Sequence, residues 1–409
     1  TSDKPHYPFE LPKGWEWTTL GEISNYGINT SVKVEEIDDN NWVLELEDIE
    51  KDSAKLIQKL SKNKREIKGT RHKFYKGNVL YSKLRTYLNK VLIASEDGYC
   101  TTEIMPFDTY GILSNEYICH VLRSSYFLDY TLQCGYGVKM PRLSTTDACN
   151  GVIPLPPLHE QYRIVKEIKR WFTLISMIEK EKDNLRETIK QAKAKVLDLA
   201  IHGKLVPQNP NDKPAVELLK RINPKAEIIS DNGHYQKLPA GWCLTILGSI
   251  GTWQSGATPS RLRKDYYGGN IPWLKTGDLN DGIITNIPEF ITEKALEETS
   301  VKLNPTDSIL IAMYGATIGK IGILSFPATT NQACCACLDY KIDKMYIFYF
   351  LLSNRINFVS MGGGGAQPNI SKEKIVNTTF LLPPLAEQKR IVSKIEELFN
   401  QLDMIEESL

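Results

Sequence analysis

The sequence predicts an α+β protein made of two mixed α/β modules in repeat, joined by long helices with a coiled-coil pattern. Three observations predict this fold class. Motifs recur at a constant displacement along the 409 residues, one long segment carries a heptad-like apolar pattern, and short strand-like runs bounded by turns fill the rest.

The repeat is defined by an opening motif and a closing motif, each of which occurs twice. The opening motif, Leu-Pro-x-Gly-Trp, begins at Leu11 and returns at Leu238, a displacement of 227 positions. The closing motif, Leu-Pro-Pro-Leu-x-Glu-Gln, begins at Leu155 and returns at Leu382, again 227 positions later. Weaker matches lie between these anchors, such as Asp48-Ile49 with Asp278-Leu279. A duplicated scaffold with divergent interiors suits a protein whose two copies recognise different things.

The segment after the first closing motif is predicted to form one long helix. Residues 159–201 contain neither Gly nor Pro, and Gly203 and Pro207 supply stop signals. Apolar residues follow alternating steps of four and three, the a/d pattern of a coiled coil, with one polar exception. At about 1.5 Å per residue this helix is roughly 60 Å long. The seam consists of Ile164, Ile168, Trp171, Ile175, Ile178, Lys182, Leu185, Ile189, Ala192, Val196 and Leu199.

The second copy repeats this seam after its own closing motif. Because a helix of this length cannot bury an apolar seam by itself, we expect the two helices to pair. The alternative is an ordinary amphipathic helix packed on its own module, which the length of the first seam disfavours. The second seam consists of Ile391, Ile395, Leu398, Leu402, Ile405 and Leu409.

These features divide the chain into five parts. We expect modules at 1–157 and 238–384, the long helix at 158–206, a linker with a short helix at 207–237, and a shorter second helix at 385–409. Further helices are expected at 115–132, 215–222 and 343–358. Strands are expected at 42–49, 79–82, 90–94, 273–276, 309–313, 321–324 and 333–338.

Composition narrows the function classes. The 50 Lys and Arg residues are balanced by 49 Asp and Glu residues, so any DNA-binding charge must be local. The first residues lack an apolar signal core and no apolar run reaches a membrane span, which predicts a soluble cytoplasmic protein. The eight Cys residues form no paired CxxC knuckles, so buried thiols are expected and a metal site is not.

The first module contains a local excess of positive charge. Residues 62–90 carry ten cationic side chains against one acid, Glu66, with aromatic residues interleaved. Such a stretch suits contacts to phosphates, which position a protein on a duplex without selecting sequence. The alternative is a solvated basic face. The DNA-binding candidates of this module are Lys62, Lys64, Arg65, Lys68, Arg71, Lys73, Lys83, Arg85, Lys139 and Arg142.

The second module offers cationic, aromatic and amide side chains. Amides can hydrogen-bond base edges bidentately, although capping of turns is an equally good interpretation of each one. The Gly-rich segment 362–365 lacks the strand, helix and GK[ST] context of a phosphate-binding loop, so a loop near DNA or a simple connector is expected. The candidates are Arg261, Arg263, Lys264, Lys275, Tyr314, Lys320, Gln367 and Asn369.

Taken together, these motifs resemble those of the type I restriction-modification specificity-subunit family. The resemblance rests on the opening motif, the Leu-Pro-Pro-Leu-x-Glu-Gln-x-Arg-Ile-Val closing motif, the helix end at 201–207, and the Ile-Pro-Trp-Leu-Lys-Thr-Gly-Asp segment at 271–278. It covers essentially the whole chain. One Leu-Pro-Pro-Leu is trivial, whereas the same anchors twice in equal frames, each followed by a heptad helix, are specific.

The resemblance implies two target-recognition domains in a pseudo-twofold repeat, separated by two long antiparallel coiled-coil helices that act as a ruler. Each domain would read half of a bipartite double-stranded DNA site. The chain itself would be non-catalytic and would dock two methylation subunits and two restriction/translocase subunits, giving an adenine-N6 DNA methyltransferase and endonuclease complex. No cofactor would bind directly, because S-adenosylmethionine would belong to the methylation subunit.

Two other functions compete with this interpretation. A stand-alone DNA methyltransferase needs a Gly-rich cofactor loop after a strand and a D/N-P-P-Y/F/W tetrapeptide for a flipped base, and the sequence contains neither. A coiled-coil scaffold that does not read DNA is compatible with the helices, but it leaves the basic stretch at 62–90 unexplained.

Overall fold

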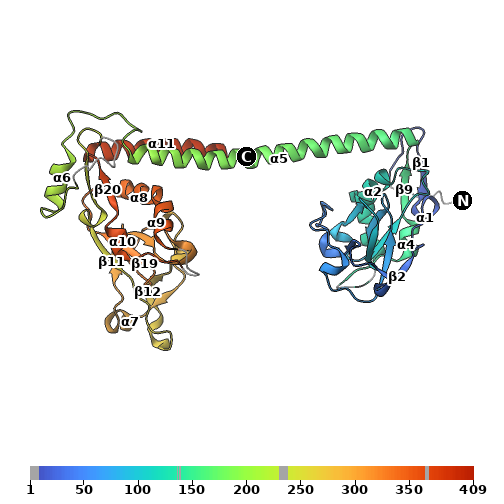
Figure 1. The fold of residues 1–409 in the computed structure, drawn as a ribbon, viewed down its shortest axis with the longest axis horizontal. Helices are drawn as coiled ribbons and strands as arrows, with labels where there is room; N and C mark the ends of the chain where they lie inside the picture. The colour runs from blue at the N-terminus through green and yellow to red at the C-terminus, as the bar shows by residue number, and fades with distance from the viewer. Residues whose placement is uncertain (1–8, 136, 138–139, 230–237, 364–367) are drawn as a thin grey trace. The chain divides into compact units, whose positions relative to one another are not determined.

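The computed structural model describes residues 9–135, 137, 140–229, 238–363 and 368–409 (Figure 1). The chain forms two compact units, Thr1–Glu179 and Lys180–Leu409. The division falls inside the long helix α5 (Leu158–Ile201), so the first half of α5 belongs to one unit and the second half to the other.

The first unit is a mixed α/β module that leads into α5. Its helices are α1 (Leu20–Ile23), α2 (Asn115–Arg123), α3 (Ser125–Cys134) and α4 (Thr145–Asn150). Its strands are β1 (Glu16–Thr19), β2 (Ser31–Lys33), β3 (Val43–Leu44), β4 (Thr70–Phe74), β5 (Val79–Ser82), β6 (Val91–Ile93), β7 (Gly98–Thr101), β8 (Ile104–Phe107) and β9 (Val152–Leu155). The strands pair in the orders β1-β9, β2-β4-β7-β3 and β6-β5-β8.

Two apolar clusters hold the first unit together. In one, Phe107 of β8 and Phe127 of α3 lie among the buried residues of α2. In the other, Trp42 packs edge-on against Phe74 of β4, with ring centroids 5.1 Å apart. Large aromatic side chains thus take part in both clusters.

The second unit contains another mixed module together with the second half of α5. Its other helices are α6 (Ala215–Ile222), α7 (Glu293–Glu298), α8 (Lys344–Ser353), α9 (Arg355–Met361), α10 (Lys372–Val376) and α11 (Leu385–Glu407). Its strands are β10 (Cys243–Ile246), β11 (Thr252–Ser255), β12 (Tyr267–Leu274), β13 (Gly282–Ile284), β14 (Phe290–Ile291), β15 (Leu303–Asn304), β16 (Ile309–Ala312), β17 (Ile321–Leu324), β18 (Ala328–Thr330), β19 (Cys334–Leu338) and β20 (Thr379–Leu382).

Each module has its own central sheet, and the two sheets have the same strand order. Strands β5, β6 and β8 pair in the order β6-β5-β8, and the second unit repeats this as β17-β16-β19 within the five-stranded order β11-β19-β16-β17-β13. The registers correspond, since Val79 lies opposite Phe107 just as Ile309 lies opposite Cys337. The second unit also has the orders β14-β12-β18-β15 and β10-β20. The repeat expected from the motifs is therefore present in the strand pairing.

The closing motif performs the same structural task in both units. Gln161 is fully buried; its amide donates to Pro156 O at 2.9 Å and its oxygen accepts from Ser114 N at 3.1 Å. Gln388 is also fully buried and makes the equivalent bonds to Pro383 O and Asp343 N at 2.8 and 2.9 Å. Each Gln thus ties the start of a long helix to a helix of its own module.

The second half of α5 pairs antiparallel with α11 (Figure 1). Lys182 contacts the carbonyl of Leu409, whereas Lys193, further along α5, pairs with Asp403 at 2.5 Å, earlier in α11. Ile189, Ile391 and Ile395 are buried there. The seam residues Ile164 and Ile168 are half-buried, and so are Val196, Leu398 and Leu402.

The middle of the seam, from Trp171 to Leu185, is largely exposed among the described residues. Trp171, Ile175 and Ile178 are 59%, 47% and 51% exposed, and Leu185 and Ile405 are 39% and 45% exposed. Pairing therefore covers a shorter stretch than the eleven seam positions suggest, because α11 is 23 residues long and α5 is 44.

Several sequence-based boundaries need correction. The helix expected at 115–132 is two helices, because Ser124 accepts a hydrogen bond from Phe127 N and starts α3. The helix expected at 343–358 is likewise divided, at Asn354. The strand expected at 42–49 is reduced to Val43–Leu44, because a 3₁₀ turn at Leu46–Asp48 ends it. The strands at 79–82 and 321–324 and the helix at 215–222 are confirmed.

Candidate nucleic-acid interface

The fold brings acidic groups to part of the basic stretch at 62–90. The Arg65 guanidinium lies 2.6 Å from Asp48 Oδ1, and the two side chains are only 9% and 0% exposed. Gln58 Nε2 donates to the same oxygen at 2.8 Å. A buried carboxylate and a buried guanidinium each need the opposite charge of the other to offset the cost of leaving water, so this pair has a structural role inside the module.

Three other cations of the stretch are engaged in a similar way. Arg71 lies 2.8 Å from Glu45 and also donates to two backbone carbonyls. Burial raises the pKa of the Glu45 carboxyl, and the Arg71 charge opposes that rise. Lys62 donates to Ile37 O at 2.6 Å, and Lys90 donates to Leu46 O at 2.7 Å. Four of the ten cations of the stretch are therefore held by groups within the module.

The exposed cations of the first module are the ones that remain available to phosphate. Lys64 is exposed and has no ion pair among the described residues. Lys68 pairs with Glu66 at 3.2 Å, but both side chains are more than 80% exposed, so this pair is weak. The Lys73 ammonium lies 5.0 Å from the Tyr75 ring centroid. Lys83 is partly exposed.

A short loop pairing occurs at the same place in both modules, and we call it the loop edge. In the first module it joins 83–85 to 141–143, with Arg85 N donating to Pro141 O at 2.7 Å. In the second it joins 313–315 to 368–370, with Gly315 N donating to Pro368 O at 2.8 Å. Five sequence candidates lie in the loop edges: Lys83, Arg85 and Arg142 in the first module, and Tyr314 and Asn369 in the second.

The loop edge has the same backbone conformation but different side chains in the two modules. Arg85 has φ 52° and its counterpart Gly315 has φ 64°, both left-handed. That conformation suits Gly and costs an Arg roughly 1–2 kcal/mol. Arg85 Nε is buried without a hydrogen-bond partner among the described residues. A strained cation where Gly would be relaxed indicates a functional constraint.

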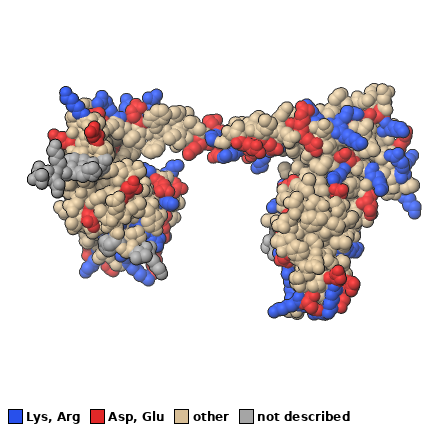
Figure 2. Space-filling model, turned by 180° about the vertical axis from the view of Figure 1, so that it is seen from behind, with Lys and Arg blue, Asp and Glu red and all other residues tan. Residues whose placement is uncertain are grey.

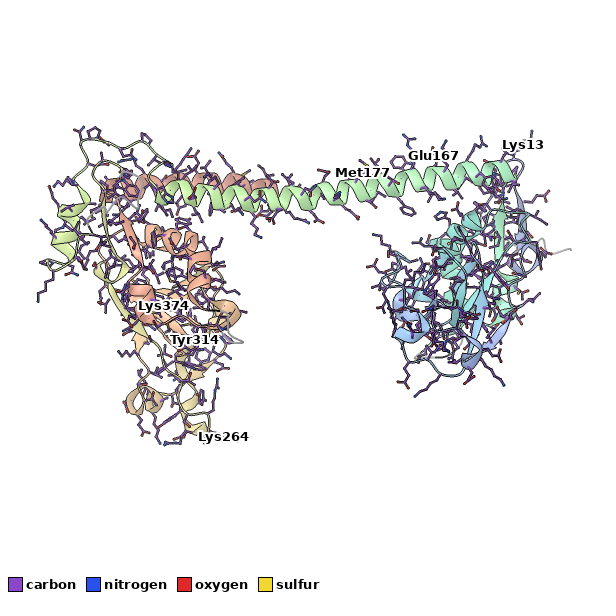
Figure 3. All side chains as sticks on the ribbon, in the orientation of Figure 1. Lys13, Glu167, Met177, Lys264, Tyr314 and Lys374 are labelled. Atoms are coloured by element: carbon purple, nitrogen blue, oxygen red, sulfur yellow. The ribbon has the colours of Figure 1, made fainter. Side chains whose placement is uncertain are left out.

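Three of the sequence candidates at the loop edge have exposed side chains. Arg142 makes a bidentate pair with Glu103, at 3.1 and 2.7 Å. Tyr314 is 42% exposed (Figure 3), and Asn369 is exposed as well. Lys320 follows the 3₁₀ turn Gly315–Thr317; its backbone N donates to Thr317 O at 2.9 Å, and its side chain is partly exposed. Lys139 and Gln367 lie outside the described residues.

The arginines of the second module are stacked on aromatic rings. The Arg261 guanidinium lies 4.5 Å from the Tyr267 ring centroid and 4.9 Å from that of Trp273. Arg263 lies 4.5 Å from the Tyr266 ring centroid and pairs with Asp265 at 2.7 Å. Basic and acidic side chains are intermixed over the lower tip of the second unit, which is drawn on the right in Figure 2.

Glu289 joins two of these candidates. Its carboxylate lies 3.1 Å from Arg261 and 2.5 Å from Lys275. The hydrogen bond from Lys275 is the main reason why the pKa of Glu289 is lowered. Glu289 was not singled out from the sequence, and neither were Glu45 and Asp48, because each lies outside the basic stretches it neutralises. The one feature of the sequence that pointed to a structural role for any of these acids was the recurrence of Asp48 as Asp278 in the second copy.

Nothing in the described ranges forms a group of three or more His, Cys, Asp or Glu side chains suited to a metal ion. The three cysteines of β19 pack into apolar clusters on both faces of the sheet. Burial raises the pKa of the Cys335 thiol to about 12, as expected for a packed side chain. Among the helices described, none is long and apolar enough to cross a membrane.

Comparison with known proteins identifies the repeated unit. Residues 12–187 and 239–409 each match the model of the type I restriction modification DNA specificity domain. The chain is 27% identical to the type I restriction enzyme EcoAI specificity subunit of Escherichia coli, across 96% of this chain and 78% of that protein. It is 24% identical to the EcoEI specificity subunit of the same species, across 98% and 80%.

Solved structures show the same fold. A chain from a type I R-M system has a TM-score of 0.64 and 19% identity, covering 98% of this chain and 94% of that one. The HsdS subunit of Thermoanaerobacter tengcongensis has a TM-score of 0.58 and 17% identity, covering 98% and 93%.

Proposed function

The chain belongs to the type I restriction-modification DNA specificity family as a specificity subunit, and from that premise we propose that its two modules read the two halves of a bipartite DNA target. The observation that carries the proposal is the loop edge. Its backbone pairing is the same in both modules, whereas Arg85 and Arg142 in one correspond to Gly315 and Asn369 in the other. An identical frame with different side chains is what two unlike half-sites require.

The exposed and partly exposed side chains fit a division between positioning and reading. In the first module Lys64, Lys68 and Lys73 would contact phosphates, which fix orientation on the duplex. Arg85 and Arg142 in the first loop edge, and Tyr314 and Asn369 in the second, would approach base edges, since Arg favours guanine and Asn favours adenine. Arg65 and Arg71 are left out of this interface because their charges are compensated inside the module.

The partners follow from the family. We propose that the chain binds double-stranded DNA together with methylation and restriction subunits, two of each. The assembly would be an adenine-N6 methyltransferase and endonuclease, with S-adenosylmethionine held by the methylation subunit and no catalytic role for this chain. The uninterrupted α5 supports a role for this helix in setting the length of the unread DNA between the half-sites.

Selection from random duplexes tests the proposal. The full chain with its methylation subunit is expected to enrich two short motifs at a fixed spacing. Replacing Arg85 should relax one motif only, and replacing Asn369 should relax only the other. If the complex enriches no motif, the chain does not read DNA and a scaffold role would be favoured. If both replacements relax the same motif, the assignment of one half-site to each module is wrong.

A further inference from the structure

An exposed leucine stands between the two stacked arginines of the second module. Leu262 is 93% exposed, more than any other large apolar side chain among the described residues. It lies in a turn closed by a hydrogen bond from Arg263 N to Ser260 O at 3.0 Å. Turns normally carry Gly, Pro, Asn, Asp or Ser, so a leucine here has no local structural reason.

Both residues that flank Leu262 are held against the module. Arg261 stacks on Tyr267 and Trp273 and pairs with Glu289 at 3.1 Å. On the other side, Arg263 forms two bonds with Asp265, at 2.8 and 2.7 Å. Stacked, bidentate guanidinium groups lose little further entropy when a ligand binds. The turn is therefore a fixed support that directs its middle side chain outward.

The support continues into the elements beneath the turn. Tyr266 is buried and its hydroxyl donates to Glu298 of α7 at 2.9 Å. Lys294 of α7 pairs with Asp265 at 2.9 Å. The hydrogen bond from Arg263 is the main cause that holds the pKa of Asp265 well below its usual range, so this carboxylate stays charged. Carboxylates thus compensate the two arginines, which are poorly placed to compete for phosphate.

Charge and position favour DNA as the ligand. Lys264 is exposed, has no ion pair among the described residues, and lies at the end of the second unit opposite α11 (Figure 3). A cation beside an apolar tip suits a duplex groove, where phosphates lie on either side of the base edges. On those edges in the major groove the apolar group is the C5-methyl of thymine.

We propose that Leu262 is a specificity-determining residue that contacts a thymine methyl group in the half-site read by the second module, with Lys264 on a neighbouring phosphate. This inference rests on the proposed function, because it assigns one base contact within it. Arg261 and Arg263 act as positioning residues that hold the turn.

The test removes the leucine and the methyl group separately. The full chain with its methylation subunit is first used to select its duplex, and each thymine of the half-sites is then replaced singly by deoxyuridine. At one position the wild-type complex is expected to lose affinity about three- to five-fold, the effect of one buried methyl-sized group. Leu262→Ala should lose a similar factor on the thymine duplex and nothing further on the deoxyuridine duplex.

Ile356→Ala is the matched control, because Ile356 is 84% exposed on α9 of the same unit. This variant should bind both duplexes like the wild type. Equal binding of all deoxyuridine duplexes by the wild type would overturn the inference, and so would a half-site without thymine. Loss of the methylation subunit by Leu262→Ala, with DNA binding intact, would assign Leu262 to a protein contact instead. A wild type that selects no sequence would remove the proposed function and this inference with it.

Discussion

The two units each have an aspartate at the same position of the repeat, and these two aspartates have different surroundings. Asp48 Oδ2 accepts from Glu45 N at 2.8 Å, and its counterpart Asp278 Oδ2 accepts from Lys275 N at the same distance, so both close the same turn. Only Asp48 is fully buried and paired with an arginine. The repeated residues thus keep the backbone frame, while neighbouring positions are free to become ion-pair partners or binding groups.

The halves of α5 differ as much as the modules do. Ile189, in the second unit, is 3% exposed, whereas Ile178, in the first unit, is 51% exposed. Both occupy the same predicted seam, and the buried one lies in the stretch of α5 that pairs with α11. A heptad pattern predicts which face of a helix seeks a partner, but it does not say how much of that face is covered.

The largest difference in stability between the two units is expected when the equivalent aspartates, Asp48 and Asp278, are replaced. Asp48→Ala leaves Arg65 buried without compensation and should destabilise the first unit by about 3–5 kcal/mol. Asp278→Ala removes a turn-closing acceptor and should cost the second unit about 1 kcal/mol. Hydrogen exchange measured unit by unit reports both values. Equal losses would show that the Asp48–Arg65 pair adds nothing to the shared turn.

The next effect concerns the two isoleucines of α5. Ile189→Ala removes a buried side chain and is expected to cost about 2–4 kcal/mol. Ile178→Ala should change stability by less than about 0.5 kcal/mol, because Ile178 is already exposed to solvent over about half of its surface. Denaturant unfolding of the two variants gives the comparison. A loss at Ile178 as large as that at Ile189 would mean that another surface covers this half of the seam.

The sequence predicted the repeat, the long helix and its seam because these depend on local periodicity and on anchors at fixed spacing. It did not predict that Arg65 and Arg71 point inward, because their partners Asp48 and Glu45 precede the stretch in which charge was counted. The loop edge was also hidden, since Leu84 and Arg142 are paired across a long separation in the chain. Candidate residues could be named from their chemistry, but only the fold separates exposed cations from structural ones.

The loop edges are expected to respond to substitution with opposite signs in the two units, each by no more than about 1 kcal/mol. Arg85→Gly relieves the left-handed strain and should stabilise the first unit by about 0.5–1 kcal/mol, while it weakens DNA binding by loss of a cation. Gly315→Ala, in the same conformation with open space around its Cβ position, should cost the second unit about 1 kcal/mol from backbone strain alone. Thermal unfolding and duplex binding are measured on both variants. A stabilised Arg85→Gly with unchanged DNA binding would mean that the strain at Arg85 serves no contact, and the two loop edges would then differ in sequence without differing in recognition.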